Sequence, residues 1–399
     1  MTTILFVHHV STIGGGSYCL LNILREINRD LFRPIVLLKN AGPLTDELNK
    51  LGISYYFLSD MDIVPYNQSL LRIKTLISYI NIIRFSHSFS AFLSKHKEID
   101  IVYMNNMMLA PYLKIAKQHH KKTLIHIREH WPLNEHKLQL RRIQNMIHRY
   151  ADQIVAINQY SAALCPLASS NQKHIVYDWI DFSERNKEMP LKEILHEANT
   201  SVLKVFLYTG GTNPIKGCIP ILRTFNSIQR DDYRLIVMGD NFNISTSNLR
   251  GRIKLILHKL GYDTYQYKIK NILDADSRIC IIPSTYQIQH LLQQVDCVLS
   301  YFTIPHANLI LAESIINNTI CIAAQNEEAL EYSDNGKLAL LFTPNDMNDF
   351  RNTILSFESK STELNSILKR ESHKIKDLFD KKANVNKLNA VLKNLSFES

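Results

Sequence analysis

Residues Thr303 to Asn326 read TIPHANLILAESIINNTICIAAQN, and the rest of the chain is organised around this stretch. Its pattern predicts a loop, then a short helix over Leu309–Asn317, then a buried strand over Thr319–Ala324. Glu313 is the one carboxylate inside this otherwise apolar helix. An unpaired buried charge is costly, so Glu313 must be solvated in a cleft, paired, bound to a ligand, or exposed on a surface helix.

The stretch is one unit in a series of alternating strands and helices that fills the chain. Apolar runs predict the strands 4–10, 33–38, 53–58, 99–104, 123–127, 153–157, 202–208, 234–238, 278–282, 297–301 and 319–324. This alternation predicts an α/β fold with two Rossmann-like, doubly wound parallel sheets, and ligands at the carboxyl ends of their strands, in a cleft between the two domains.

The domain organisation follows from where this series is interrupted. We predict an N-terminal domain over residues 1–177 and a polar, strand-poor linker over 178–200. A second domain is expected over 201–370, followed by a C-terminal helix over 371–399 that could cross back to the first domain. A chain of 399 residues is too long for one ordinary core, which agrees with two domains.

Composition places the chain among soluble globular proteins, with 45% apolar and 21% charged residues. Its six cysteines lie far apart, which favours unpaired thiols in a reducing compartment over disulfides or a zinc site. The start, MTTILFVHHV, predicts a first strand rather than a signal peptide, and no apolar run approaches the roughly 20 residues that span a bilayer. We therefore expect a cytoplasmic protein.

Positive charge is concentrated in the first half of the chain. The formal net charge is +9, and residues 1–170 hold 19 Lys and Arg against 11 Asp and Glu. Such an excess predicts an acidic partner for that half, such as anionic lipid, a phosphorylated substrate or nucleic acid. Nucleic acid is the least favoured of these, because the chain has no aromatic-interleaved basic motif and no zinc-finger spacing.

Two glycine-rich loops follow predicted first strands. Gly14 to Gly16 suit either a plain tight turn or a ligand loop at a helix start. They fail as a dinucleotide fingerprint, because Cys19 stands where the third glycine is needed. The second loop, YTGGTNPIKG over residues 208–217, places Lys216 near a helix start, where it is either a cation for a diphosphate or a solvated surface lysine.

Two further segments carry charge in a suggestive context. HIREHWP, residues 126–132, crowds ionisable groups at the end of a predicted strand, which favours function over an Arg–Glu pair that only holds the loop. SLLRIKTLISYINIIRF, residues 69–85, mixes apolar residues at helical spacing with Arg72, Lys74 and Arg84. It is either a core-facing amphipathic helix, which we favour, or a helix on a membrane surface.

Taken in order, these motifs resemble those of the GT-B-type retaining glycosyltransferases of family 4, over nearly the whole chain. ILFVHHVSTIGGGSYCLLNIL resembles the family's opening strand, glycine loop and helix, ADQIVAINQYSAAL the end of its first domain, and IVYDWIDF its "VYNGID" segment. YTGGTNPIKG is similar to "GRLxPxKG", LIVMGD to "VGDG", LLQQVDCVLSYF to "aDvfv", and the stretch quoted first to "EPFGLxxxE". The order and spacing of the motifs are more specific than any one of them.

The resemblance implies a nucleotide-sugar donor bound mainly by the second domain and an acceptor bound mainly by the first. Glu313 matches the glutamate that accepts hydrogen bonds from the ribose hydroxyls, and Lys216 matches the lysine on the donor diphosphate. The other donor-binding positions that we expect are Gly15, Gly16, Gly210, Gly211, Ala307, Asn308 and Leu309.

Three positions depart from the family pattern. Pro305 replaces a sugar-contacting glutamate, Gly211 replaces an arginine, and Arg128 stands where the first domain often has a histidine. We expect Arg128 to supply the missing cation, so that it and Lys216 form the catalytic pair. The neighbouring residues expected on the acceptor side or sugar side are His126, Glu129 and His130.

The resemblance also implies a reaction and a setting. The sugar is transferred with retention, and the protein stabilises the departing diphosphate without a nucleophile of its own. It implies no metal and no other cofactor. The basic first half of the chain, taken with this analogy, favours a glycan or lipid-diphosphate-linked acceptor in surface polysaccharide biosynthesis, with peripheral contact to an anionic inner membrane face. The alternatives are a sugar-nucleotide 2-epimerase and a non-catalytic nucleotide-sugar-binding or scaffold subunit; a dehydrogenase is weakened by the failed fingerprint.

Overall fold

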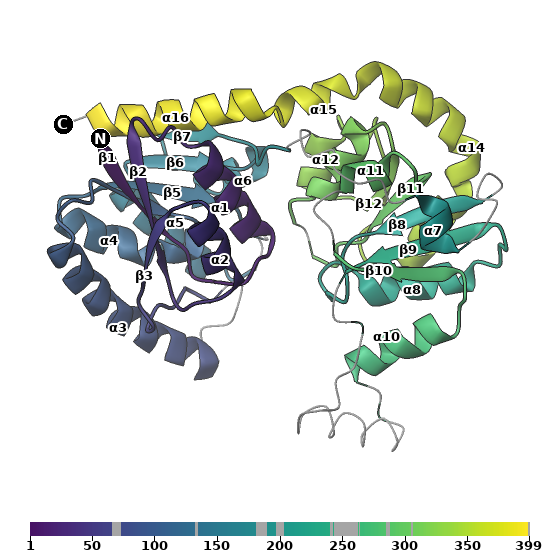
Figure 1. The fold of residues 1–399 in the computed structure, drawn as a ribbon, viewed down its shortest axis with the longest axis horizontal. Helices are drawn as coiled ribbons and strands as arrows, with labels where there is room; N and C mark the ends of the chain where they lie inside the picture. Colours follow the sequence, from purple (N-terminus) through teal and green to yellow (C-terminus); the bar gives the residue numbers. More distant parts are fainter. Residues whose placement is uncertain are drawn as a thin grey trace. The chain divides into compact units, whose positions relative to one another are not determined.

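The computed structural model describes residues 1–65, 73–131, 135–180, 190–196, 203–239, 242, 262, 264–284, 288–304 and 306–397. The chain divides into two compact units, Met1–Trp179 together with Asp380–Ser399, and Ile180–Phe379. Each unit is built on one parallel sheet flanked by helices (Figure 1). The predicted fold class, with two doubly wound Rossmann-like domains, is confirmed.

The first unit has a seven-stranded sheet in the order β3-β2-β1-β4-β5-β6-β7. Its strands are β1 Thr2–Val7, β2 Phe32–Leu38, β3 Ser54–Phe57, β4 Ile101–Met104, β5 Lys122–Ile127, β6 Gln153–Ala156 and β7 Lys173–Ile175. The central strands β1 and β4 are buried along almost their whole length because helices cover both faces of the sheet. The strand order reverses between β1 and β4, and open α/β sheets bind ligands beyond the carboxyl ends of the strands at such a point.

Helices cover both faces of this sheet and form two separate cores. They are α1 Gly15–Glu26, α2 Pro43–Lys50, α3 Ile73–Lys95, the 3-10 turn η1 Met107–Leu109, α4 Pro111–Gln118, α5 Lys137–Tyr150, α6 Gln159–Ala163 and α16 Lys381–Phe397. One core packs α3, α4 and α5 against the sheet through residues such as Phe85, Tyr112 and Ile147. The other packs α1, α2 and α16 against the opposite face.

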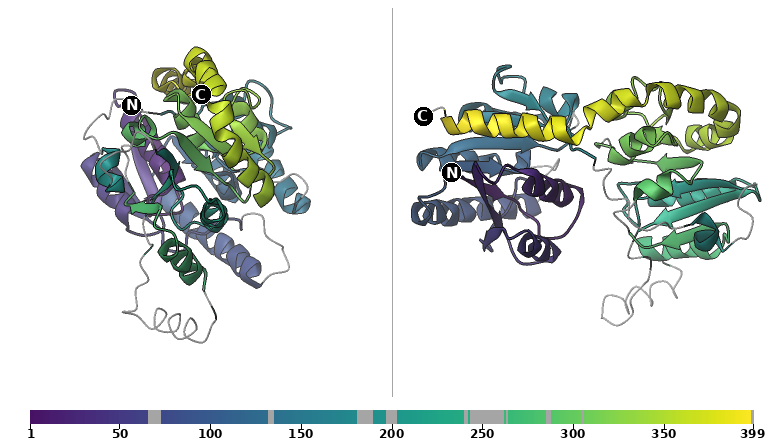
Figure 2. Two further views of the ribbon diagram at one scale, coloured as in Figure 1. Left: turned by 90° about the vertical axis from the view of Figure 1, so that its right-hand side faces the viewer. Right: turned by 45° about the horizontal axis from the view of Figure 1, so that its top comes forward.

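The last helix, α16, belongs to the first unit although it follows the whole second unit in sequence (Figure 2). Leu388, Val391, Leu392 and Leu395 enter the core that α1 and α2 also form. The buried Asn384 accepts a hydrogen bond from the backbone N–H of Tyr177 at 3.0 Å. The end of the chain therefore completes the core of the domain that its beginning starts.

The second unit has a six-stranded parallel sheet in the order β10-β9-β8-β11-β12-β13. Its strands are β8 Lys204–Tyr208, β9 Tyr233–Met238, β10 Ile279–Ile282, β11 Cys297–Ser300, β12 Ile320–Ala324 and β13 Leu340–Phe342. Its helices are α7 Leu191–Leu195, α8 Cys218–Ser227, α10 Tyr265–Asp274, α11 Ile288–Leu292, α12 Leu309–Ile316, α13 Glu327–Tyr332, α14 Met347–Glu371 and α15 His373–Leu378. The order reverses between β8 and β11, so their carboxyl ends mark this unit's ligand position.

The structure differs from the sequence-based expectation at several boundaries. β1 ends at Val7, and the side chains of the following His8 and His9 make hydrogen bonds with Ser17 and Asn106. The helical segment after β4 is divided into η1 and α4, since Pro111 starts a new helix. Asp178 and Trp179, placed in the predicted linker, belong to the first unit. Of the described helices, none is long and apolar enough to cross a membrane.

Candidate functional site

The loop after β8 holds Lys216 close to the ends of neighbouring strands. Gly217 has a φ of +77°, and a Cβ there would lie 2.1 Å from the carbonyl oxygen of Tyr301. Gly211 also has a positive φ, of +55°, and the hydroxyl of Tyr208 occupies the place where Gly210 would carry a Cβ. A side chain at Gly217 or Gly210 would push the loop away from the strand ends, which is why glycine stands there.

Hydrogen bonds tie this loop to the loop that follows β11. The N–H of Thr303 donates to the carbonyl of Ile215 at 2.8 Å, and its hydroxyl donates to the same oxygen at 3.2 Å. The N–H of Ile215 donates to the side chain of Asn213 at 2.9 Å. Lys216 is thereby fixed beside the segment that leads into α12.

The start of α12 is anchored to the end of β11. Asn308, only 2% exposed, is the N-cap of α12, and its amide exchanges hydrogen bonds of 2.9 and 3.1 Å with the hydroxyl of Ser300, the last residue of β11. The same amide oxygen caps the N–H of Leu311 at 3.4 Å. Ala307 and Leu309 flank this cap at the positive end of the helix, where free backbone N–H groups favour an anion.

Glu313 lies in the second turn of α12 and interacts with Lys216. It is half-buried, so the alternative of an exposed surface residue is wrong. Burial raises the pKa of Glu313 to about 7, and the charge of Lys216 opposes this rise. Burial also lowers the pKa of Lys216, although its side chain remains partly exposed, and Glu313 opposes that change. Within the described part of the chain, neither side chain has a hydrogen bond or a salt bridge.

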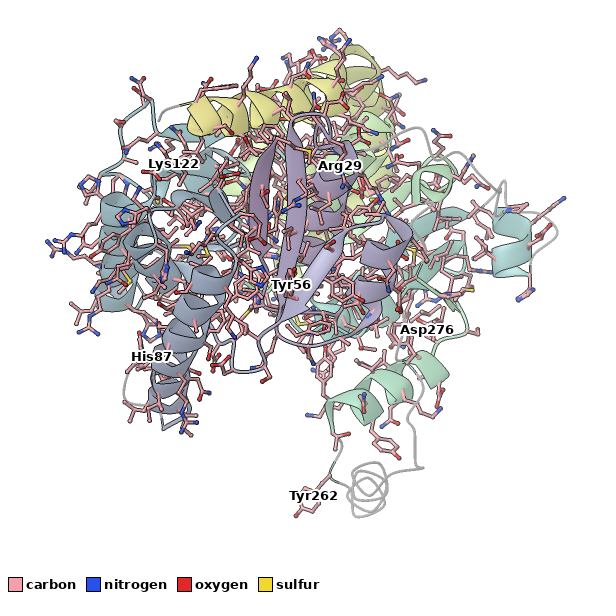
Figure 3. The ribbon with its side chains drawn as sticks, turned by 60° about the vertical axis from the view of Figure 1, so that its left-hand side comes forward. Arg29, Tyr56, His87, Lys122, Tyr262 and Asp276 are labelled. Carbon is pink, nitrogen blue, oxygen red and sulfur yellow. The ribbon has the colours of Figure 1, made fainter. Side chains whose placement is uncertain are left out.

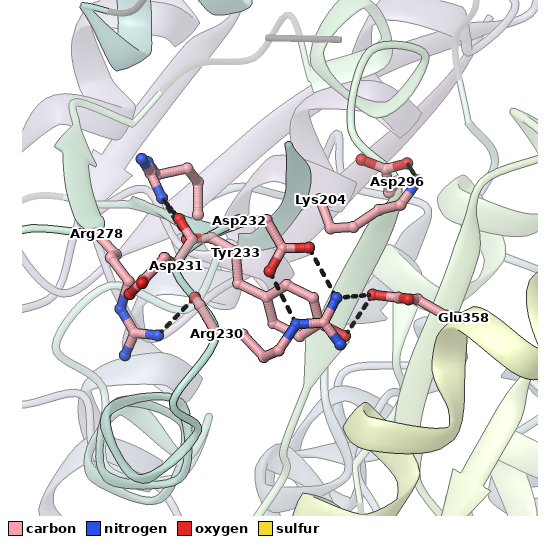
Figure 4. Close-up of polar contacts among 9 residues, drawn as sticks. Lys204, Arg230, Asp231, Asp232, Tyr233, Arg278, Asp296 and Glu358 are labelled. Carbon is pink, nitrogen blue, oxygen red and sulfur yellow. Dashed lines mark hydrogen bonds and ion pairs between the residues drawn. The ribbon is translucent and has the colours of Figure 1, made fainter. Parts of the chain in front are cut away.

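Charged side chains at the opposite edge of the same sheet form ion pairs and so have a structural role. At the amino ends of β8, β9 and β10, charged side chains pair with one another (Figure 4). Arg230 makes bonds of 2.8 and 2.7 Å to Asp232 and one of 2.7 Å to Glu358. Among the described residues, Lys216 and Glu313 have no such partners at the carboxyl edge, which is typical of groups held for a ligand.

The first unit presents a glycine loop at the end of β1. Gly14 is the N-cap of α1, which begins at Gly15, and no side chain caps this helix start. A Cβ added at Gly14, Gly15 or Gly16 would meet no atom within 4 Å. The loop therefore leaves open space in front of an uncapped helix N-terminus, as an anion-binding loop requires.

Arg128, which we expected to act on the donor phosphates, is held in an internal ion pair. Its Nη1 lies 2.6 and 2.7 Å from the two carboxylate oxygens of Asp178, and its Nε donates to Asn105 at 3.2 Å. The residue is 9% exposed. Asp178 neutralises the positive charge of Arg128, which we expected to act on the donor phosphates. The geometry therefore fits a positioning role for Arg128 better than the role of a phosphate-binding cation.

His126 belongs to the same buried network. Its Nδ1 accepts hydrogen bonds from the Nη2 of Arg128 at 3.2 Å and from the hydroxyl of Tyr103 at 2.5 Å. Burial, assisted by the charge of Arg128, holds the pKa of His126 well below its usual value, so the ring is neutral. Since Nδ1 accepts, Nε2 carries the proton, and it has no hydrogen-bond partner among the described residues.

Glu129 and His130 fasten the loop after β5. The Oε2 of Glu129 accepts hydrogen bonds from the N–H groups of Met107 at 3.1 Å and Arg128 at 3.0 Å, and burial raises the pKa of Glu129 to about 7. His130 is 4% exposed and stacks on Tyr160 with ring centroids 4.1 Å apart. These contacts give Glu129 and His130 a structural task at this strand end.

Three members of this network were missed in the sequence: His8, Asn105 and Asp178. His8 contacts Ser17 of α1 at 3.0 Å through Nε2 and Asn105 at 3.0 Å through Nδ1, and burial lowers the pKa of His8 to about 3. Asn105 thus links His8 to Arg128. The available signal was polar residues directly after the apolar runs of β1 and β4, at the point where the sheet order reverses.

Comparison with protein families finds no matching model, and no curated protein sequence matches this chain. Solved structures do match. HepE from Anabaena, solved with UDP-glucose, superposes with a TM-score of 0.72 at 18% identity over 99% of this chain and 100% of its own. A glycosyltransferase from Rickettsia africae gives 0.68 at 16% identity over 100% and 99% of the two chains.

A third match is the lipopolysaccharide outer core galactosyltransferase WaaB, with a TM-score of 0.61 at 16% identity over 99% of each chain. The three neighbours are GT-B glycosyltransferases. At these identities the likeness establishes the fold, and this chain has the GT-B fold along its whole length. Pro305, one of the three departures, lies outside the described residues.

Proposed function

We propose that this protein is a glycosyltransferase that moves a sugar, with retention, from a nucleoside-diphosphate sugar to a glycan or lipid-linked acceptor. One observation carries the proposal: Lys216, which is exposed, and Glu313, which is half-buried, interact electrostatically beside an anchored helix start, and among the described side chains each has the other as its electrostatic partner. Both lie at the switch point of a GT-B sheet. HepE, which shares this fold, was solved with UDP-glucose.

Each group is assigned one task toward the donor. The Glu313 carboxylate accepts hydrogen bonds from the ribose hydroxyls, and Lys216 neutralises the diphosphate as the sugar–oxygen bond breaks. The N–H groups at the start of α12 add partial positive charge, and Gly210 and Gly211 let the loop that carries Lys216 stay close to the strand ends. In the first unit, the open helix start at Gly15 and Gly16 takes part in binding the phosphates or the sugar.

The transfer itself needs no protein nucleophile in this scheme. The sugar–phosphate bond breaks through an oxocarbenium-like state, and the departing phosphate oxygen takes the proton of the acceptor hydroxyl on the same face. Lys216 stabilises the leaving diphosphate, while Arg128, already neutralised by Asp178, positions His126. The neutral ring of His126 then offers its Nε2 proton to a sugar hydroxyl.

A panel of UDP-, GDP- and dTDP-sugars, assayed for nucleotide release with and without acceptor glycans, tests the proposal. Release that depends on acceptor supports transfer, and sugar isomerisation would point to an epimerase. We expect Lys216→Ala to lower turnover on the order of 10²–10³-fold, the range for removal of one charge-stabilising group. Lys204→Ala is the matched control, since this lysine lies at the opposite strand edge beside Asp296. Equal effects of the two changes would contradict the assignment.

A non-catalytic, nucleotide-sugar-binding subunit is the second candidate, and one observation favours it. Arg128 is paired with Asp178, and Gly211 stands where the family pattern has an arginine. Of the cations expected near the donor diphosphate, Lys216 is therefore the one that remains available. Donor binding without turnover across the panel would select this candidate. For a transferase we propose that no metal is needed, so that activity persists in EDTA; loss of activity restored by Mg²⁺ or Mn²⁺ would refute this.

The acceptor and its location are proposed from charge and from one structural neighbour. The excess of basic residues in the first half suits a lipid-diphosphate-linked glycan, and WaaB, which shares this fold, is a lipopolysaccharide outer core galactosyltransferase. We therefore place the reaction in surface polysaccharide biosynthesis, with the first unit in peripheral contact with an anionic membrane.

A further inference from the structure

The helix α3 is apolar on two faces, and the core of the first unit covers one of them. Ile82, Phe85 and Phe89 are buried in that core. On the opposite side, in the first half of the helix, four large aliphatic side chains are between 51% and 61% exposed: Leu76, Ile77, Ile80 and Ile83. Their spacing of one, four and seven residues places them on one helix face, which we call the α3 stripe. A contiguous exposed apolar stripe marks an interaction surface.

The surface around the α3 stripe is strongly cationic. Helices α3, α4 and α5 form one layer on a single face of the sheet, where α4 packs against both of its neighbours (Figure 3 labels His87 on α3). Within their bounds, α3 has three Lys or Arg residues, α4 has two and α5 has four, and none of the three contains an Asp or a Glu. Their nine positive charges equal the formal excess of the whole chain, +9.

A groove on this layer gathers several of these cations. It has a volume of about 550 Å³ and lies between α4 and α5. Lys114, Arg142 and Arg149 line it with exposed side chains, beside the partly buried Met146 and Tyr150. A groove with cationic walls and apolar side chains suits an anionic headgroup that carries an acyl chain.

The acidic groups that adjoin the layer are engaged with it or lie at its edge. Asp152 pairs with Lys117 of α4 at 2.8 Å. Asp62 accepts a hydrogen bond from Asn81, and Asp60 accepts one from Ser88, both on the flank of α3. The groove residues Arg142 and Arg149 and the surface around the α3 stripe therefore keep a net positive charge.

We propose that the α3–α4–α5 face docks on an anionic membrane surface, with the α3 stripe among the lipid headgroups and the groove on lipid phosphates. A second copy of this chain is a poorer occupant, because a two-fold contact would bring like-charged faces together. The proposal deepens the proposed function, on which it rests for the location of the acceptor; the docking surface itself requires no catalysis.

Flotation of the full-length protein with liposomes tests the surface without any donor sugar. We expect the protein to float with mixed phosphatidylcholine and phosphatidylglycerol vesicles at low salt, to remain in solution with phosphatidylcholine alone, and to be released by high salt. Absence of flotation with the anionic vesicles at low salt would overturn the proposal. Because the assay contains no nucleotide sugar, its failure is distinct from a failure of the proposed transferase activity.

Two variants separate the apolar and the cationic contributions. Ile77→Gln/Ile80→Gln/Ile83→Gln should weaken anionic-vesicle partitioning by at least about tenfold. Arg142→Gln/Arg149→Gln should weaken it by roughly thirty-fold, since each cation near an anionic surface contributes about fivefold. The matched controls lie on α14 of the second unit, where Leu355→Gln and Lys360→Gln/Lys369→Gln should change it little.

Folding controls and the oligomeric state of the variants also test the proposal. Circular dichroism and thermal melting of each variant confirm that it is folded, which is expected because the replaced side chains are exposed. Partitioning of the folded α3 variant equal to that of the unchanged protein would overturn the role of the stripe. Size-exclusion chromatography with light scattering tests for a dimer. If the unchanged protein is a dimer and the same variant is a monomer, a second copy covers this face and the proposal fails.

Discussion

At the residue scale, two ionisable groups at strand ends behave differently because their surroundings differ. Glu313 is half-buried without a hydrogen bond from the described residues, and desolvation raises its pKa; desolvation also lowers the pKa of Lys216, although that residue is exposed. Arg128 is buried, but Asp178 and Asn105 satisfy its guanidinium. Burial alone therefore does not distinguish Glu313 from Arg128; the presence or absence of hydrogen-bond partners among the described residues does.

The raised pKa of Glu313 predicts how nucleotide binding depends on pH. A carboxyl with a pKa of about 7 is largely protonated at pH 6, and only its ionised form accepts hydrogen bonds from both ribose hydroxyls. We therefore expect the affinity for nucleoside diphosphate to increase as the pH is raised from about 6 to about 8, measured by titration calorimetry. Glu313→Gln should remove this dependence, and an unchanged pH profile in that variant would contradict the assignment.

The same shift predicts a change in stability of the opposite sign. Between the ordinary pKa of 4.5 and the folded-state pKa of about 7, folded Glu313 holds a proton that the unfolded chain has released. The contribution of Glu313 to the free energy of unfolding therefore falls as pH rises through this window. Urea denaturation across the window should show a shallower fall for Glu313→Gln; Glu129→Gln is a useful comparison, because the pKa of Glu129 is also raised to about 7.

The Arg128–Asp178 ion pair predicts a specific pattern of stabilities. Arg128→Ala leaves a largely buried carboxylate unpaired and should cost about 3–5 kcal/mol in urea denaturation. Arg128→Met/Asp178→Leu removes both charges and should lie much closer to the unchanged protein. If Arg128→Ala were instead fully stable and lost nucleotide affinity, Arg128 would be a phosphate cation after all.

At the element scale, α12 is positioned by its first residue. The amide of Asn308 caps the helix and joins it to Ser300 at the end of β11, and one more helical turn places Glu313 opposite Lys216. The Ile215–Thr303 hydrogen bonds hold the partner loop in register with this helix. A local cap and one loop contact thus set the geometry around Glu313 and Lys216.

Removal of this cap should therefore reduce both stability and binding. Asn308→Ala loses the cap and leaves the Ser300 hydroxyl without its partner, which should cost about 1–3 kcal/mol in denaturation and weaken nucleotide binding. The matched control is Asn158→Ala, because Asn158 is equally buried and caps α6 in the first unit. It should cost a similar stability and leave the affinity unchanged; a similar loss of affinity would mean that the effect is indirect.

At the scale of the whole molecule, the C-terminal helix α16 completes the core of the first domain. The core that α1 and α2 form also contains residues of α16, from the other end of the sequence. The fold of the first unit therefore depends on a segment separated from it by the entire second unit.

One helix supplies both the test and its control. Leu392 is fully buried in that core, so Leu392→Ala should destabilise the first unit by about 2–5 kcal/mol. Phe397 lies at the end of the same helix with 71% of its surface exposed, and Phe397→Ala should change the free energy of unfolding by less than about 0.5 kcal/mol. Similar effects of the two changes in thermal or urea unfolding would show that α16 is not part of the core.

Local sequence patterns were enough to predict the two sheets, the loop that carries Lys216 and the helix that carries Glu313. Apolar runs between helical segments predict strands at their own positions, and the glycines around Lys216 and the lone Glu313 stand out in their own neighbourhoods. The tertiary structure was needed to find the partner of Arg128, which lies 50 residues away in sequence, and the hydrogen bond between His8 and Asn105, which are 97 residues apart. Such contacts follow from the order of strands in the sheet, which local pattern does not encode.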